Sequence, residues 1–473
     1  NTTRRDLGHP WWSWFQFAKK KYRVALSLCW GEVATHNNFA LDRGGNVFKQ
    51  TAPVIKLPEG KSSEEHLALL GVLNSSVACF WLKQVCQPKG SSGMGRGIYD
   101  EAWESFSAFN ATSVKELPLP SSRSPELAFA LDALAAESVS LLEDLGGISE
   151  PLADHLEKCR GREIEIKRRM VALQEELDWQ ALAAYGLVES DLPLLGAHAP
   201  PIELGQRAFE IVLARQVARG ETQTEWFARH GSVPSTEIPA NWPTEYRAIV
   251  ESRITLIESD PDVGLIERPE HKRRWNRTTW EERQREALTG LVLDALEDME
   301  EGSDIGLRST AELTDLLRAQ PLMVEALELL AEKKDDDLAS TVRRLVTGAA
   351  VPHPSAQRLT EKGLRKRDAW DEVWELQRVE DRIEALTELP EDDPRRLSRI
   401  RAESVKGQQL EPLPVPPKYA QADFRSASFW RHRGKLDVPK ERFVLVPSAE
   451  IGADSSPVVG WAGWDERDLA RAI

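Results

Sequence analysis

The apolar positions near the start of the chain recur first at strand spacing and then at helix spacing. Four short apolar runs separated by turn-forming residues lie between residues 22 and 57 and predict strands. Residues 42–46 contain two glycines, which accept the positive φ of a tight reversal, so a hairpin is expected there. Residues 63–85 repeat apolar positions every three or four residues, which predicts one buried helix beginning after a serine cap.

Most of the remaining chain has the periodicity of amphipathic helices. A glycine-rich loop at residues 87–97 and a short aromatic segment at 103–109 precede residues 125–187, which predict a helical hairpin broken at Gly146 and Gly147. A proline-rich joint follows at 193–201, and the chain ends in aromatic-rich sequence with a strand expected at 442–446. Further helices are expected at residues 206–219, 243–258, 280–298, 310–317, 322–333, 337–346 and 360–386.

These patterns predict an α+β fold in which a β-containing domain is followed by mainly helical domains. We expect the β-containing domain at residues 1–120 and a helical connector at 121–192. An acidic helical domain is expected at 193–350, and a C-terminal helix with a small aromatic-rich region at 351–473. The length of 473 residues is sufficient for several such parts.

The charge of the chain is unevenly distributed. The formal net charge is −15, which alone argues against a nucleic-acid-binding protein, because a surface that binds phosphates must be locally positive. Residues 1–120, however, carry 14 Lys and Arg against 10 Asp and Glu, a balance of +4, so the rest of the chain carries −19. Contacts with double-stranded DNA are therefore expected in residues 1–120.

Three groups of side chains in this region are of the types that bind DNA. A run of basic residues follows the first aromatic run, Asn and Arg lie near the expected hairpin ends, and further cations flank the glycine-rich loop. A solvated charge run and the preference of Asn for turns explain the same residues equally well. The candidate DNA-binding residues are Lys19, Lys20, Lys21, Arg23, His36, Asn37, Asn38, Arg43, Lys49, Lys83, Lys89 and Arg96.

No motif for catalysis or metal binding stands out. Asp262, Glu270 and Lys272 superficially match a metal nuclease, but Pro269 would interrupt the strand that such a site requires. We expect the following Arg273, Arg274 and Trp275 to hold helices together instead.

Other signatures are also missing from the sequence. It contains no P-loop, no Gly-x-Ser-x-Gly elbow and no Asn-Pro-Pro-Tyr segment of amino methyltransferases. Four cysteines without a Cys-x-x-Cys pair indicate reduced thiols, and no apolar run is long enough to span a membrane. A cytoplasmic protein without a catalytic residue, metal or cofactor of its own is expected.

Several segments of the sequence resemble a known family. Residues 33–39, 56–58, 67–76, 80–82 and 117–120 resemble the target-recognition domain of single-chain adenine methyltransferases. Residues 169–187 resemble the helix that follows such domains in fused restriction-modification enzymes. The segments at 242–243, 265–275, 414–419, 437–443 and 460–465 resemble the C-terminal part of the PglX family of adenine-specific DNA methyltransferases, which act in bacteriophage-exclusion (phage growth limitation) systems.

The resemblance implies a role in choosing the DNA site. It places the S-adenosylmethionine-binding and catalytic domain upstream of Asn1, so the chain is expected to be a fragment and no catalytic residue can be assigned to it. The implied partners are double-stranded DNA, the missing N-terminal methyltransferase domain and other phage-defence proteins. Two alternatives stay open, a stand-alone DNA specificity subunit and an acidic helical scaffold that binds proteins.

Overall fold

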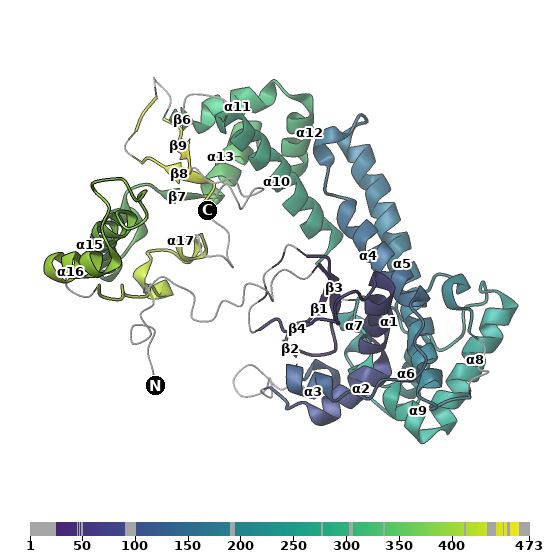
Figure 1. The fold of residues 1–473 in the computed structure, drawn as a ribbon. Helices are drawn as coiled ribbons and strands as arrows, with labels where there is room; N and C mark the ends of the chain where they lie inside the picture. The colour runs from purple at the N-terminus through teal and green to yellow at the C-terminus, as the bar shows by residue number, and fades with distance from the viewer. Residues whose placement is uncertain are drawn as a thin grey trace. The chain divides into compact units, whose positions relative to one another are not determined.

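The chain forms two compact units in the computed structural model (Figure 1). Of the described residues, those between 25 and 144 and between 154 and 284 form the N-terminal unit, and those in 145–153 and between 285 and 462 form the C-terminal unit. The structure describes residues 25–44, 46, 48, 51–89, 101–189, 194–275, 278–301, 306–333, 336–410, 413–432, 441–447, 449–451 and 455–462.

Two small antiparallel sheets open the N-terminal unit. In the first, β1 (Ser27–Cys29) lies between β3 (Ala40–Asp42) and β4 (Val54–Ile55), with Leu28 opposite both Leu41 and Ile55. In the second, β2 (Val33–Ala34) pairs with β5 (Ser107–Ala108). Strands in three of the four predicted apolar runs are confirmed, whereas the run at 46–50 and the tip of the expected hairpin lie partly outside the described residues.

The single helix predicted for residues 63–85 is wrong, because the structure has two helices there. Helix α1 (Ser63–Leu73) ends at Asn74, and α2 (Ser76–Val85) begins after Ser75, with a bend of 65° between them. The Ser75 hydroxyl accepts a hydrogen bond from the amide of Ala78 at 3.2 Å, as an N-cap does. Apolar periodicity continues across this break because both helices bury residues in one core, so it hides the boundary.

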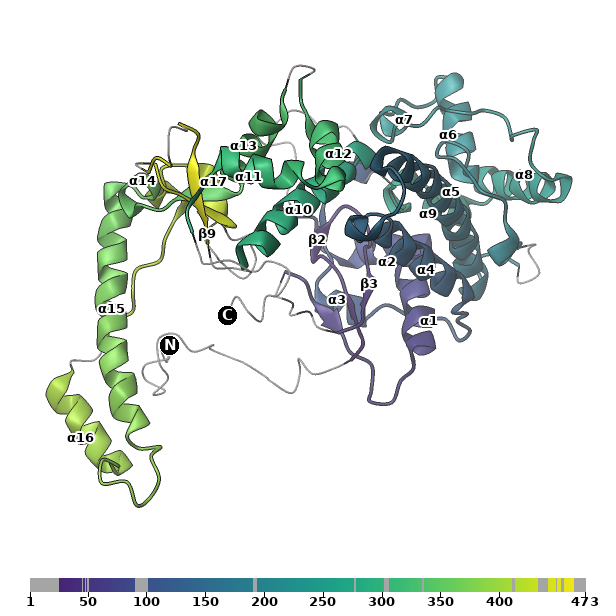
Figure 2. The same cartoon turned by 90° about the horizontal axis from the view of Figure 1, so that it is seen from above.

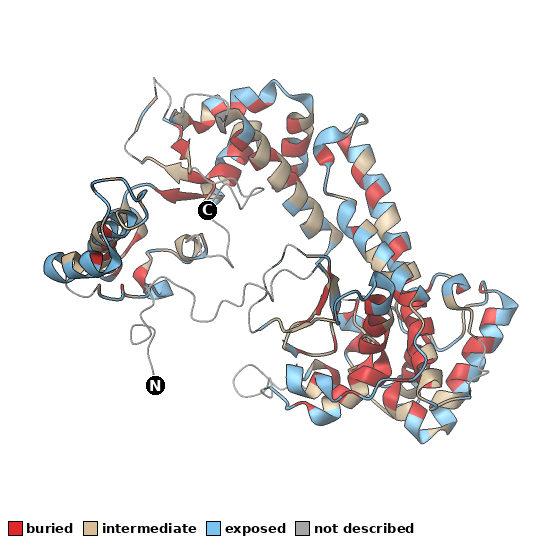
Figure 3. Cartoon of the chain, viewed as in Figure 1, coloured by how far each residue is buried: buried red, intermediate tan, exposed pale blue. Residues whose placement is uncertain are grey.

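The helical hairpin predicted at residues 125–187 is confirmed. It consists of α4 (Glu126–Ser140) and the 33-residue helix α5 (Leu152–Ala184), with the short 3-10 helix η4 (Leu145–Gly147) between them. Leu173 and Leu177 of α5 pack into one core with Leu28 of β1 and Leu67 of α1. Figure 3, which colours each residue by its burial, shows many buried residues where α1 and α5 lie.

The rest of the N-terminal unit is helical, and the helices predicted at 206–219 and 243–258 are confirmed. Helices α6 and α8 pack on α5 around Met170, Val212 and Tyr246. A second cluster joins Trp103 and Trp226. The remaining elements are η3 (Ala102–Glu104), α3 (Ala111–Lys115), η5 (Gly196–His198), α6 (Ala208–Ala218), α7 (Trp226–Arg229), α8 (Thr244–Ser259), α9 (Pro261–Ile266) and η6 (Pro269–His271).

The C-terminal unit contains helices and a mixed sheet. Its sheet has the order β6-β9-β8-β7, in which only β7 and β8 are parallel. Figure 2 shows the long helix α15 with α16 folded back beside its end. The strands are β6 (Arg308–Ser309), β7 (Ala350–Pro352), β8 (Phe443–Leu445) and β9 (Val458–Trp461). The helices are α10 (Trp280–Glu301, from Arg285 onward in this unit), α11 (Thr310–Arg318), α12 (Pro321–Leu330), α13 (Leu338–Gly348), α14 (Ser355–Arg358), α15 (Glu361–Ala385), α16 (Arg399–Gln409), η7 (Gln421–Asp423) and α17 (Ala427–Arg431).

The predicted α+β class is confirmed, with small sheets and a larger helical part. None of the four cysteines, all of which lie in the described ranges, forms a disulfide bond. Within the described ranges no single helix is long and apolar enough to cross a membrane; α1 and α2 pass that test only jointly, as a bent pair. Most residues of α1 are buried in the core of the N-terminal unit.

Candidate nucleic-acid interface

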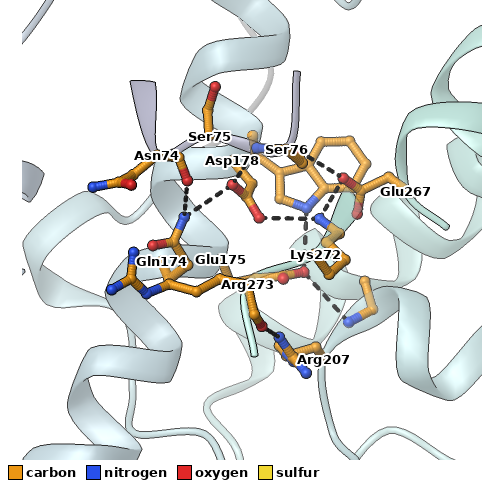
Figure 4. A network of polar contacts seen from close by, with 12 residues as sticks. Asn74, Ser75, Ser76, Gln174, Glu175, Asp178, Arg207, Glu267, Lys272 and Arg273 are labelled. Carbon is orange, nitrogen blue, oxygen red and sulfur yellow. Dashed lines mark hydrogen bonds and ion pairs between the residues drawn. The ribbon is translucent and has the colours of Figure 1, made fainter. Parts of the chain in front are cut away.

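A buried ionic network organises the centre of the N-terminal unit (Figure 4). The ammonium of Lys272 lies 3.1 Å from Asp178 of α5 and also donates to Glu267. The other oxygen of Asp178 accepts hydrogen bonds from the amide of Ser76 at 2.9 Å and from Gln174 at 3.0 Å. The network therefore joins the start of α2, the middle of α5 and the segment that follows α9.

Two further buried cations are paired in the same way. Arg253 of α8 lies 2.7 Å from Glu176, and both side chains are completely buried. Arg207 lies 2.8 Å from Glu210, whose carboxylate also accepts a hydrogen bond from the Trp226 indole at 3.0 Å. A buried charge is costly unless it is paired and hydrogen-bonded, and each of these cations has its carboxylate.

The network holds more carboxylates than Lys272 can neutralise. Burial raises the pKa of Glu267 to about 7, because Lys272 offsets the effect only in part while Glu175 and Asp178 add to it. Burial alone would lower the pKa of Lys272, but Asp178, Glu267 and Glu175 outweigh it and raise that pKa. Lys272 is therefore charged at neutral pH, whereas Glu267 titrates near neutrality.

This network fixes the backbone of the residues next to Lys272. The guanidinium of Arg207 donates a hydrogen bond to the carbonyl of Arg273 at 3.2 Å, and the His271 ring lies against Phe80 of α2 at 5.2 Å. In the described part of the chain no group of three His, Cys, Asp or Glu side chains could hold a metal ion. The carboxylates consequently position the segment that carries Arg273 and Arg274.

A cluster of basic side chains lies beside this segment. His36 follows β2, Lys83 lies in the last turn of α2, and Arg273 and Arg274 follow η6. Burial, together with the charges of Arg274, Arg273 and Lys83, lowers the pKa of His36 to about 3. We call His36, Lys83, Arg273 and Arg274 the basic cluster.

Two members of the basic cluster lack the compensation that the other buried cations have. Lys83 and Arg274 are half-buried, and within the described ranges neither forms an ion pair. Nε and Nη2 of Arg274 are buried and have no hydrogen-bond partner among the described residues. The carboxylates that attract them, Glu104 for Arg274 and Glu270 for Lys83, form ion pairs with Arg229 at 2.9 Å and Arg268 at 4.0 Å.

The cost of burying these two cations lowers the pKa of both. Burial lowers the pKa of Arg274 to about 10, which Glu104 and Cys79 offset only in part. Burial also lowers the pKa of Lys83, and Arg274 contributes by repulsion. An anion bound here would relieve this cost.

Aromatic rings pack against the Arg274 side chain of the basic cluster. The Arg274 guanidinium lies 4.8 Å from the centre of the Trp103 ring, which in turn contacts Trp226 at 5.3 Å. The His230 ring lies 4.0 Å from that of Trp226. Stacking on Trp103 holds the guanidinium without neutralising it.

Of the candidate DNA-binding residues, the structure brings together His36 and Lys83. Lys89 is exposed at the edge of the described region, and its amide bonds to the carbonyl of Phe106 at 2.9 Å. Arg43 is 56% exposed and forms an ion pair with Asp132 of α4. The candidates Lys19, Lys20, Lys21, Arg23, Lys49 and Arg96 lie outside the described residues.

The two candidate asparagines have internal hydrogen-bond partners. Asn37 is only 2% exposed, and its amide donates to the carbonyls of Leu73 at 2.7 Å and Ser75 at 3.0 Å. The side-chain oxygen of Asn38 accepts a hydrogen bond from the amide of Gly31 at 2.9 Å. In this conformation Asn37 holds the junction of α1 and α2, and Asn38 holds a turn.

The nuclease-like residues do not converge. Asp262 lies in the first turn of α9, Glu270 in the 3-10 helix η6, and Lys272 is enclosed by its two carboxylate partners. Arg273 and Arg274 were absent from the sequence-based candidates. The sequence predicts that they hold helices together, and their place in an uninterrupted basic run, Lys272 to Arg274, is the signal that could have identified them.

Comparisons with known proteins define the relationship of the chain. It is 44% identical over 478 aligned residues to the adenine-specific methyltransferase PglX of Streptomyces coelicolor, and the alignment covers 98% of this chain. The chain spans only 38% of the length of this relative, and no solved structure matches it. The similarity confirms the resemblance to PglX. Residues 170–473 match the family described as "Domain of unknown function (DUF7008)", and the chain therefore belongs to the DUF7008 family.

Proposed function

We propose that this chain is the DNA-recognition portion of a site-specific adenine-N6 DNA methyltransferase that acts in phage defence. The relationship to PglX supports this assignment, since that relative is an adenine-specific methyltransferase. In the full-length enzyme, S-adenosylmethionine would bind to another part, and the target adenine would be flipped out of the duplex because a stacked base cannot be reached. The residues of this chain would hold the duplex.

The observation that carries the proposal is the missing counter-charge of Lys83 and Arg274. The same unit pairs its fully buried cations Lys272, Arg207 and Arg253 with carboxylates, whereas the half-buried Lys83 and Arg274 form no ion pair within the described residues. Phosphate oxygens are suitable partners for an ammonium group, and neutralising them releases counterions from the duplex. Lys83 would make the direct contact, while Arg274, whose Nε and Nη2 atoms are buried, would strengthen the local positive potential.

Binding of duplex DNA to the full 473-residue chain tests the proposal. Fluorescence anisotropy with a labelled duplex of random sequence compares the parent with Lys83→Gln and Arg274→Gln. A matched control is Lys61→Gln, because Lys61 is 46% exposed in the same unit and pairs only locally with Glu65.

We expect Lys83→Gln to weaken binding about tenfold, the loss expected for a charge-assisted hydrogen bond, and Lys61→Gln to leave it nearly unchanged. Arg274→Gln is expected to weaken binding less than Lys83→Gln. Equal affinities for the parent, Lys83→Gln and Lys61→Gln would remove the basic cluster from the DNA surface. Absence of any duplex binding by the parent would instead favour an acidic scaffold that binds proteins.

A further inference from the structure

The C-terminal unit contains a cavity of about 960 Å³, and none of the residues proposed to contact the duplex lines it. Four aromatic side chains line it. Trp370 lies on α15, Tyr419 precedes η7, Phe424 lies between η7 and α17, and Trp430 lies on α17. Arg358, Arg367 and Lys418 line the same cavity. A cavity of this size can accommodate more than one planar ring.

The four rings form a continuous row. Trp370 and Tyr419 are nearly parallel, with an angle of 10° between their planes and 6.5 Å between their centres. Tyr419 contacts Phe424 at 5.7 Å, and Phe424 contacts Trp430 at 5.4 Å. Such a row offers apolar faces on which planar groups can stack.

The row is held in place by contacts between α15 and the segment after residue 416. The Trp370 indole donates to the carbonyl of Pro417 at 2.7 Å, and Lys366 donates to the carbonyl of Lys418 at 2.7 Å. Gly363 allows the closest approach, since a Cβ atom there would lie 2.3 Å from the carbonyl oxygen of Asp423. The aromatic faces are therefore set by backbone contacts rather than by the rings alone.

The charge of the lining is opposite to that of the chain. Among the described residues that line the cavity none is a carboxylate, although the chain carries a net charge of −15. Arg367 is 48% exposed and has a loose ion pair with the exposed Asp371 at 3.6 Å, which an incoming anion can replace at little cost. Arg358 is held more firmly, by Glu441 at 3.4 Å and the carbonyl of Pro352.

We propose that this cavity binds nucleotide units of single-stranded nucleic acid, whose bases stack on the aromatic row while Arg367 and Lys418 contact phosphates. Aromatic rings combined with a positive groove are the arrangement by which proteins bind unpaired strands, because every base has a π face. A cage for a quaternary ammonium group would favour carboxylates rather than three cations in its lining. This inference does not rest on the proposed duplex contacts of the N-terminal unit.

The test uses the full chain and a fluorescently labelled oligothymidine of about 20 nucleotides, a length chosen to exceed the roughly 4–16 nucleotides that one such site covers. Trp370→Ala removes a ring of the row, and Trp374→Ala is its control, because Trp374 lies one turn further along α15, is 39% exposed and does not line the cavity. Arg367→Gln is compared with Arg365→Gln, an exposed cation on the same helix.

We expect Trp370→Ala to weaken oligothymidine binding about tenfold, as loss of one stacked base does, with little change for Trp374→Ala. Arg367→Gln should weaken binding more than Arg365→Gln, and because Arg367 is exposed this pair stays informative even if Trp370→Ala unfolds the cavity. Affinity for duplex DNA should be unchanged in all four variants, which separates this site from the basic cluster.

Competition identifies the natural form of the ligand. Displacement of the labelled strand by millimolar thymidine monophosphate would assign the cavity to a free nucleotide, and displacement only by unlabelled oligonucleotide would assign it to a strand. The proposal is overturned if the parent does not bind oligothymidine, or if neither the Trp370 nor the Arg367 variant differs from its control.

Discussion

Lys272 lies 3.1 Å from Asp178, although 94 residues separate them along the chain. The contact joins the segment after α9 to the middle of α5, and through Ser76 it also reaches the start of α2. The same buried network thus supports Lys83, which lies on α2, and Arg274, which follows Lys272 by two residues. The ionic contacts of the folded N-terminal unit therefore hold the segments that carry the basic cluster.

Removing Lys272 should destabilise the N-terminal unit strongly. Lys272→Ala leaves Asp178 and Glu267 buried without their cation, and breaking a buried pair in this way typically costs about 3–5 kcal/mol. Urea unfolding followed by circular dichroism measures the change, with the exposed Lys61→Ala as the control, expected below about 1 kcal/mol. Similar unfolding midpoints for the two variants would show that the network is dispensable.

Glu267 should make stability depend on pH near neutrality. Its pKa is raised from 4.5 to about 7, so the folded state keeps its proton where the unfolded state has lost it. This contribution is complete below about pH 4.5 and is lost as the pH rises to about 7, because the folded protein must then ionise a buried carboxyl.

Glu267→Gln removes this titration, and the expected result is a difference in melting temperature, variant minus parent, that increases between pH 5 and pH 7. Differential scanning calorimetry over this range, at constant ionic strength, provides the measurement. A difference that stays constant with pH would contradict a raised pKa for Glu267.

Asn37 should contribute to stability rather than to base recognition. Asn37→Ala removes the side-chain donor from the buried carbonyls of Leu73 and Ser75, of which Ser75 keeps the amide of Cys79, and loss of a buried donor typically costs about 1–3 kcal/mol. We expect a lower melting temperature and an unaltered preference among duplex sequences. A variant with parental stability but changed sequence preference would restore the base-reading role predicted from the sequence.

Gly363 should control the aromatic cavity of the C-terminal unit. Gly363→Ala places a Cβ atom against the carbonyl oxygen of Asp423, so α15 must move away from the segment that carries Tyr419 and Phe424. Both the melting temperature and oligothymidine affinity should fall. Gly407→Ala in α16, where nothing lies within 4 Å, should be neutral or slightly stabilising, as Ala is a better helix former. Equal behaviour of the two variants would mean that the close approach at Gly363 is not needed.

The sequence predicts the helices well because their periodicity is local. The hairpin of α4 and α5 and the helices at residues 208–218 and 244–259 follow from apolar spacing alone. The boundary at Asn74 and Ser75 is hidden, because α1 and α2 bury their apolar residues in the same core. The pairing of β7 with β8 joins residues about ninety positions apart, which no short pattern indicates.

The sequence predicts only part of the basic cluster, because its candidates include His36 and Lys83 but not Arg273 and Arg274. Dense runs such as Lys19 to Lys21 are conspicuous in a sequence, whereas the absence of a counter-charge is a property of the folded structure. The charges of Lys83 and Arg274 act on His36 because the fold brings segments that are distant in the sequence close together. For the same reason, Asn37 resembles a base-reading residue in the sequence and is a buried donor in the structure.

The salt dependence of duplex binding tests the DNA-recognition assignment most directly. Each phosphate contact made by a cation contributes about 0.9 to the slope of log K against log salt concentration, so Lys83→Gln should flatten the slope by up to about 0.9 relative to the parent. Lys61→Gln should keep the parental slope. If Lys83→Gln also keeps it, while the variant remains folded, Lys83 makes no phosphate contact and the proposed interface is wrong.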